Sequence, residues 1–192
     1  MTKQWLVAVL AGLTMASAAS AQMAHSPDSQ DLTPPHQVEM YLDGFHNYLG
    51  QEHHPKETQL QKRYAHYCKQ LSPDMFQCII YDGNGKDAHL VGTEHVISEK
   101  LYKELPSAER KYWHPHDGEV DSGLLRAPGM DSEKEKQTLE FLKHTYGKTW
   151  NVWQPDDKLP YGAPRLMWSV QPADVTEKTK KSVAAREVDF HF

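Results

Sequence analysis

The sequence predicts an α+β fold, a single domain with a mainly antiparallel sheet flanked by a few helices. Short segments rich in β-branched and aromatic residues follow one another through turn-forming sequences, which is typical of strands linked as hairpins. Helical patterns are few, and they do not alternate with strands in the order of a parallel sheet. The chain has 192 residues, which is the length of one ordinary domain.

Residues 1–21 have the composition of a secretory signal peptide. Lys3 supplies a positive start, an apolar stretch runs from Trp5 to Ala19, and Ala19-Ser20-Ala21 forms a small-residue cleavage site. The apolar stretch is shorter than the roughly 20 residues that span a bilayer, which favours cleavage over membrane anchoring. We therefore expect a periplasmic or secreted protein with no transmembrane helix after cleavage.

The next residues lead into the folded domain. Residues 22–35 are rich in Ser, Asp, Gln and Pro, so we expect a flexible leader there. Beyond it, apolar residues recur with the spacing of one helix face and predict a helix over 36–49. These residues are Val38, Tyr41, Leu42, Phe45 and Leu49. We assign 36–172 to the folded domain and 173–192 to a polar C-terminal tail.

The middle of the chain contains the clearest strands. Two are predicted at 64–71 and 76–82, joined by the turn sequence Ser72-Pro73-Asp74-Met75, and a third follows at about 88–97. The later expected elements are two short helices capped by Ser98 and Ser107 and ending near 105 and 113, a strand at 119–125, a helix at 132–146, strands at 149–154 and 165–170, and a possible edge strand within 178–192.

The charge of the chain argues against a nucleic-acid partner. It has 21 Lys and Arg against 26 Asp and Glu, a formal charge of −5. Removal of residues 1–21 would take away one lysine and no acidic residue, which leaves 20 basic against 26 acidic side chains, or −6. Nucleic-acid binding depends on clustered Lys and Arg that neutralise phosphates, and the basic clusters here are short and interrupted.

The two cysteines are placed to form a disulfide. Cys68 and Cys78 lie at equal distances from Pro73, so a hairpin centred on that turn places them directly opposite one another. Cross-strand partners lie within the Cα separation that a disulfide needs. In an oxidising compartment we expect the bridge to form, and two small buried thiols are the alternative.

Several histidines and acids have the types and spacing of metal ligands. His114 and His116 are two residues apart and would point to the same side of an extended segment, with Glu119 close by. Two imidazoles and a carboxylate are a recurring ligand set for divalent metals such as zinc. His66 could join them, together with either Glu94 or His95 on a neighbouring predicted strand. The alternative is that these histidines are ordinary hydrogen-bonded residues of the core.

Motifs spread over much of the chain resemble one family. They are Tyr-Ala-His-Tyr-Cys (64–68), Gly-Thr-Glu-His-Val-Ile-Ser (92–98), Trp-His-Pro-His-Asp-Gly-Glu (113–119), Tyr-Gly-Lys-Thr (146–149) and Leu-Pro-Tyr-Gly-Ala-Pro (159–164). In this order the set is similar to the oil body-associated proteins of plants, whose bacterial relatives are mostly carried as a domain of unknown function. The resemblance covers roughly 36–172 and implies a shared fold and an association with lipid.

The sequence therefore supports two classes of function. It contains no Gly-x-Ser-x-Gly elbow, phosphate loop or dinucleotide fingerprint, so no enzyme class is identified. We expect an exported envelope protein that binds a lipid or other apolar ligand without catalysis. The alternative is a metal-dependent enzyme or metal-binding protein that uses His66, His114, His116 and Glu119. Converging imidazoles would favour the second class, and an apolar pocket without them the first.

Overall fold

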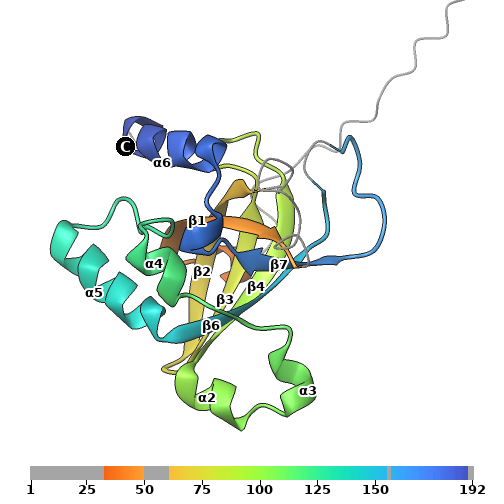
Figure 1. The fold of residues 1–192 in the computed structure, drawn as a ribbon, viewed down its shortest axis with the longest axis vertical. Coiled ribbons are helices and arrows are strands. Elements are labelled where there is room, and N and C mark those ends of the chain that lie inside the picture. The colour runs from red at the N-terminus through yellow and green to blue at the C-terminus, as the bar shows by residue number, and fades with distance from the viewer. Residues whose placement is uncertain (1–32, 50–60, 155–156, 190–192) are drawn as a thin grey trace, which may run out of the picture. The chain divides into compact units, whose positions relative to one another are not determined.

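The computed structural model describes residues 33–49, 61–154 and 157–189. The expected signal peptide (1–21) and nearly all of the expected leader (22–35) lie outside the described residues. The described part belongs to one compact unit that begins at Thr33. Its elements are coloured along the chain in Figure 1.

The strands form a closed antiparallel barrel. They are β1 (Met40–Tyr48), β2 (Lys62–Ser72), β3 (Met75–Tyr81), β4 (Leu90–Ser98), β5 (His114–Pro115), β6 (Thr145–Asn151) and β7 (Arg165–Ser169). The sheet order is β4-β3-β2-β1-β7-β6-β5, and a further pairing of β4 with β6 closes it. The two residues of β5 pair with the first part of β6, whose last part pairs with β7. The expected antiparallel sheet is confirmed, and closure is its more specific form.

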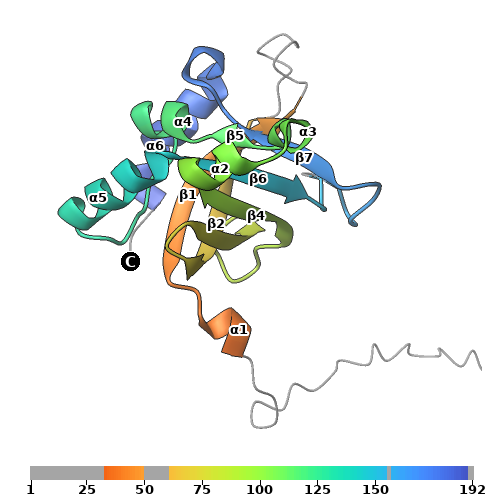
Figure 2. The same cartoon turned by 90° about the horizontal axis from the view of Figure 1, so that it is seen from below.

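Short helices lie around the barrel, as Figures 1 and 2 show. They are α1 (Thr33–His36), α2 (Glu99–Glu104), α3 (Ser107–Arg110), α4 (Asp117–Asp121), α5 (Ser132–Lys143), the 3-10 turn η3 (Pro172–Asp174) and α6 (Glu177–Asp189). Ser98 caps α2 as expected, accepting a hydrogen bond from the Leu101 amide, and α5 confirms the predicted helix after Ser132. Within the described ranges, no helix is both long and apolar enough to cross a membrane.

The predicted helix over 36–49 is wrong, because this segment forms strand β1 after the single turn of α1. Seven consecutive residues of β1, from Leu42 to Tyr48, are buried. Both faces of the strand are covered, so its sequence lacks the polar–apolar alternation by which a half-exposed strand is recognised. The apolar residues that remain happen to recur at helical spacing.

Two later predictions also fail. Residues 119–125 do not form a strand: the segment begins with helix α4 and continues in irregular structure. The expected edge strand in 178–192 is helix α6, as far as the described residues extend. The helix is held by Arg186, which donates hydrogen bonds to the Gly123 and Leu124 carbonyl oxygens and lies 3.0 Å from the Asp43 carboxylate. Tertiary contacts therefore fix a segment whose own pattern is weak.

Apart from a further apolar cluster of Phe45, Leu124 and Val170, the main groups of buried side chains form three layers. One apolar cluster contains Leu42, Val96, Leu142 and the Cys68–Cys78 disulfide, which confirms the predicted bridge. A second apolar cluster consists of Tyr48, Tyr64, Ile80, Val91 and Met167. Buried polar residues lie between them; these are His46, His66, Glu94, His114, His116, Glu119 and Thr149. The barrel thus holds a polar layer enclosed by apolar side chains.

Candidate metal centre

Glu94 lies in the middle of the polar layer. It belongs to β4, where its Cα partners are Cys78 on one side and Thr149 on the other. Only 4% of Glu94 is exposed, and the Thr149 hydroxyl donates a hydrogen bond of 2.9 Å to its Oε1 atom. A carboxylate so far from solvent is costly unless cations or several donors surround it. The side chains around Glu94 therefore decide what this layer is for.

Three imidazoles approach this carboxylate through their Nε2 atoms. His114 Nε2 lies 3.4 Å and His116 Nε2 3.5 Å from Glu94 Oε1, and His66 Nε2 lies 3.5 Å from Oε2. The ring centroids of His114 and His116 are 5.2 Å apart. The two histidines therefore face a shared carboxylate, as the sequence predicted.

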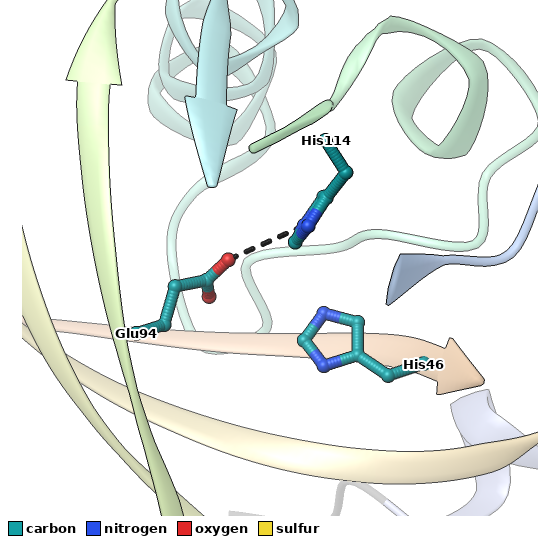
Figure 3. Close-up of side chains that lie close together, drawn as sticks. All are labelled: His46, Glu94 and His114. Carbon is teal, nitrogen blue, oxygen red and sulfur yellow. Dashed lines mark ion pairs between the residues drawn. The ribbon is translucent and has the colours of Figure 1, made fainter. Parts of the chain in front are cut away.

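His46 is a fourth imidazole in the same layer. Its ring centroid lies 4.9 Å from that of His66 and 5.6 Å from that of His114. One ligand atom each of His46, Glu94 and His114 lies within 4.8 Å of the others, and Figure 3 shows these three side chains facing one another. His46 was missed because its strand was predicted to be a helix. Its Cα lies opposite Lys62 on β2 and Ser169 on β7.

Glu119 is the outer acidic group of the cluster. It is the buried residue of α4, and its Oε1 atom lies 3.8 Å from His116 Nε2. Its backbone carbonyl oxygen accepts hydrogen bonds from the Leu124 and Leu125 amides, which fixes the position of the helix. All four residues predicted from the sequence, His66, His114, His116 and Glu119, are thus brought together, and Glu94 rather than the exposed His95 completes the group.

Several ring nitrogens and one carboxylate oxygen of this layer have no hydrogen-bond partner among the described residues. They are His46 Nδ1, His66 Nδ1, both ring nitrogens of His114 and Glu119 Oε2. Leaving a buried polar atom unpaired costs about 1–3 kcal/mol, and such atoms are rare in folded proteins. Five of the ten such atoms in the described residues lie in this layer, and one of them, His114 Nε2, faces Glu94.

The tautomer of His116 is set by its outer neighbour. Thr145 Oγ1 donates to the Leu142 carbonyl oxygen at 2.6 Å, so the same oxygen accepts the hydrogen of His116 Nδ1 at 2.8 Å. In the neutral ring, this leaves the lone pair on Nε2, the nitrogen that points toward Glu94. A second partner that orients an imidazole in this way is the usual support of a metal-binding histidine.

Burial and neighbouring groups set the protonation states of these side chains. Burial lowers the pKa of His46, His66 and His114, so these rings are neutral at neutral pH. Burial also opposes ionisation of Glu94, but the attraction of His114 and His116 outweighs it and holds the pKa of Glu94 well below 4.5. Neutral imidazoles and an ionised carboxylate are the states that bind metals.

The pKa values of the other two groups, Glu119 and His116, are raised. Burial raises the pKa of Glu119 to about 8, so this carboxyl group holds a proton at neutral pH. Burial opposes the charge on His116 as well, but Glu94 and Glu119 outweigh that effect and raise the pKa of His116 above 6.5. A metal ion beside His116 would displace the proton from its Nε2 atom.

Gly147 has no side chain, so polar atoms of Glu94, His114 and His116 can lie close to its backbone. This residue lies on β6, opposite His114 of β5. A Cβ atom at this position would lie 2.6 Å from His116 Nε2 and 2.8 Å from His114 Nε2, and closer still to Glu94 Oε1. The three ligand atoms therefore converge over a backbone position where any side chain would collide with them.

Comparison with known proteins gives the family. Residues 32–192 match the model of a protein family of unknown function, DUF1264. The chain is 40% identical over 144 residues to oil body-associated protein 2A of Arabidopsis thaliana, which covers 74% of this chain and 56% of that protein. It is 39% identical over 140 residues to oil body-associated protein 1A of Zea mays, covering 72% of this chain and 56% of the relative.

The chain spans slightly more than half the length of these relatives. No solved structure matches it. The match to the family model extends over most of the chain, and the relatives confirm the resemblance that the sequence motifs indicated. The chain therefore belongs to the DUF1264 family and is related to the oil body-associated proteins.

Proposed function

We propose that the barrel binds one divalent transition-metal ion in its polar layer. The proposal rests on one observation above all: the Nε2 atoms of His66, His114 and His116 converge on the buried Glu94 carboxylate, with His46 beside them. Imidazole ligands with one carboxylate suit zinc, iron and the neighbouring transition metals, and suit magnesium or calcium poorly. We expect Glu119 to contribute from the edge of the site.

The surroundings favour a metal-holding role over the processing of a large substrate. The polar layer lies between two apolar clusters, and the hollow that reaches His46 has almost no volume open to a water-sized molecule. Pockets for ligands of ordinary drug size measure about 300–1,000 Å³. We therefore propose that the bound ion meets either no substrate or only very small ligands.

Metal titration of chelator-treated protein tests this proposal. A saturating ion should raise the melting temperature of the full chain by about 5–10 °C, because it binds the folded state alone. The double substitution His46→Ala and His114→Ala should abolish the shift. His95→Ala is the matched control, since His95 lies on the same strand as Glu94 but is exposed, and its shift should equal that of the unsubstituted protein.

A second candidate function is contact with a lipid surface, as first expected from the sequence. It is favoured by the names of the relatives, which describe association with oil bodies. It is also favoured by the exposed apolar residues 159–164 in the loop between β6 and β7. We propose that this contact takes place in the cell envelope, on the strength of the signal-peptide pattern in residues 1–21. An intact mass that begins at Gln22 in an extract of the envelope would support export, and retention of Met1 would contradict it.

A further inference from the structure

We infer that the tip of the β6–β7 connection, residues 159–164, docks the protein onto a phospholipid surface. This inference rests on the lipid contact proposed above and assigns it a face of the molecule. The polar layer of the barrel takes no part in it. The loop is one of the sequence motifs that the metal centre leaves unexplained.

The tip is apolar and exposed throughout. Its sequence is Leu-Pro-Tyr-Gly-Ala-Pro, and each of these residues is exposed. Leu159 is 53% and Tyr161 62% exposed, the two largest values among the large apolar side chains of the described residues. Soluble proteins seldom expose a continuous apolar segment, and such segments mark contact sites. Figures 1 and 2 both show this connection extending away from the barrel.

The tip is also conformationally restricted, which lowers the entropy that docking would cost. Pro160 and Pro164 fix two backbone angles, and Gly162 has a φ of +80°, in the region that favours glycine. The Tyr161 amide donates a hydrogen bond to the Leu159 carbonyl oxygen at 2.9 Å. A tight turn that presents Leu159 and Tyr161 is therefore already formed before contact.

The same end of the barrel carries further exposed apolar side chains. Leu49 follows β1, Leu90 begins β4 and Val152 follows β6, and each is 43–44% exposed. The Leu49 amide bonds to the Leu166 carbonyl oxygen of β7, and the Val152 amide to that of Val91. These three residues therefore lie around the base of the loop, where they would meet a surface once the tip is inserted.

The chemistry of the loop fits a phospholipid headgroup region. Two exposed basic residues, Lys158 and Arg165, flank the tip, and Asp156 and Asp157 precede it in the sequence, so these flanks carry no net charge. The Arg165 guanidinium lies over the Tyr48 ring, which holds it at the base of the loop. Tyrosine and basic side chains are enriched where apolar segments enter bilayers. A narrow projecting turn offers little flat area for a protein partner, whereas a lipid surface can admit it.

Vesicle flotation with the full chain tests this inference. Vesicles of phosphatidylcholine, with or without phosphatidylglycerol, should carry the protein upward, because the apolar tip would insert into either. The pair Leu159→Glu and Tyr161→Glu should weaken binding by about tenfold or more, because charges would replace the inserted side chains. The matched control is Leu71→Glu with Phe141→Glu, two comparably exposed apolar residues away from this loop, and it should bind normally.

The outcomes separate this inference from the lipid function on which it rests. If the unsubstituted protein floats and both pairs of variants float equally well, lipid contact holds but this loop is not the docking face. Equal loss in both pairs, with unchanged melting temperatures, would also overturn the assignment to the loop. If the unsubstituted protein does not float with either vesicle, the lipid function and the docking face fall together. Neither result bears on the metal centre.

Discussion

The interior of the barrel and the loop at 159–164 depart in opposite ways from the usual distribution of polarity. The interior buries a carboxylate and several imidazoles, whereas the loop exposes a run of apolar residues. Each arrangement costs stability in a monomer alone in water. Under the functions proposed above, the two regions have different partners: a cation for the buried layer and a lipid surface for the loop.

The largest effect is expected from substitution of the central carboxylate. Glu94→Gln removes the negative charge toward which three imidazoles point, so metal affinity should fall by more than about 100-fold. Glu119→Gln is the matched change, because Glu119 already holds a proton at neutral pH, and it should lower the affinity less than about tenfold. Competition with a chromophoric chelator measures both values. Equal losses in the two variants would contradict a central role for Glu94.

Gly147→Ala should close the metal centre and leave the loop unchanged. The new methyl group would collide with the ligand atoms of Glu94, His114 and His116. We expect loss of the metal-dependent rise in melting temperature, with vesicle flotation retained. Gly85→Ala provides the control, since a Cβ atom there meets nothing within 4 Å. A Gly147→Ala protein that still takes up a full equivalent of metal would show that the ligands lie elsewhere.

The disulfide should stabilise the barrel without serving either site. Cys68 and Cys78 close a short loop, so the double substitution to alanine should lower the free energy of unfolding by about 2–3 kcal/mol. Chemical denaturation of the metal-free protein measures this difference. Flotation on vesicles should stay the same at temperatures where the variant is folded. An unchanged free energy of unfolding would mean that the bridge is absent in solution.

The smallest effect concerns the stability of the metal-free protein as pH changes. The pKa values of His46, His66 and His114 are lowered by burial, so their contribution is present above pH 6.5 and is lost as pH falls below it. The raised pKa values of Glu119 and His116 act in the opposite direction. The stability that Glu119 gives at low pH is lost as pH rises through about 8. The stability that His116 gives is lost as pH rises above 6.5. Between pH 4.5 and 6.5 the effect of the three histidines outweighs that of Glu119, so the melting temperature should be highest near neutral pH. A steady rise from pH 6 to pH 9 would contradict these protonation states.

Local sequence patterns predicted most strands but not the closure of the sheet. The hairpin at Pro73 and the cap at Ser98 are set by neighbouring residues, and both appear where expected. The pairing of β4 with β6 joins segments about fifty residues apart, and no local pattern encodes it. Strand β1 was mistaken for a helix because both of its faces are buried.

The candidate site was predicted only in part, because local patterns group residues that are close in sequence and not those that barrel closure brings together. His114, His116 and Glu119 are close in sequence, so their residue types and spacing were enough to group them. Glu94 remained one of two choices with His95, and only the strand direction shows that Glu94 points inward. His46 was out of reach, because its place in the layer depends on the strand assignment of β1 and on barrel closure.

Elemental analysis combined with native mass spectrometry tests the central claim most directly. The protein should be purified without chelators or a histidine tag, next to the His46→Ala and His114→Ala double variant. The account predicts close to one transition-metal ion per unsubstituted chain, a matching mass increment in the native spectrum, and no ion in the folded double variant. A folded protein without metal that gains none from added zinc, iron or manganese would contradict it, and the polar layer would then be a hydrated core.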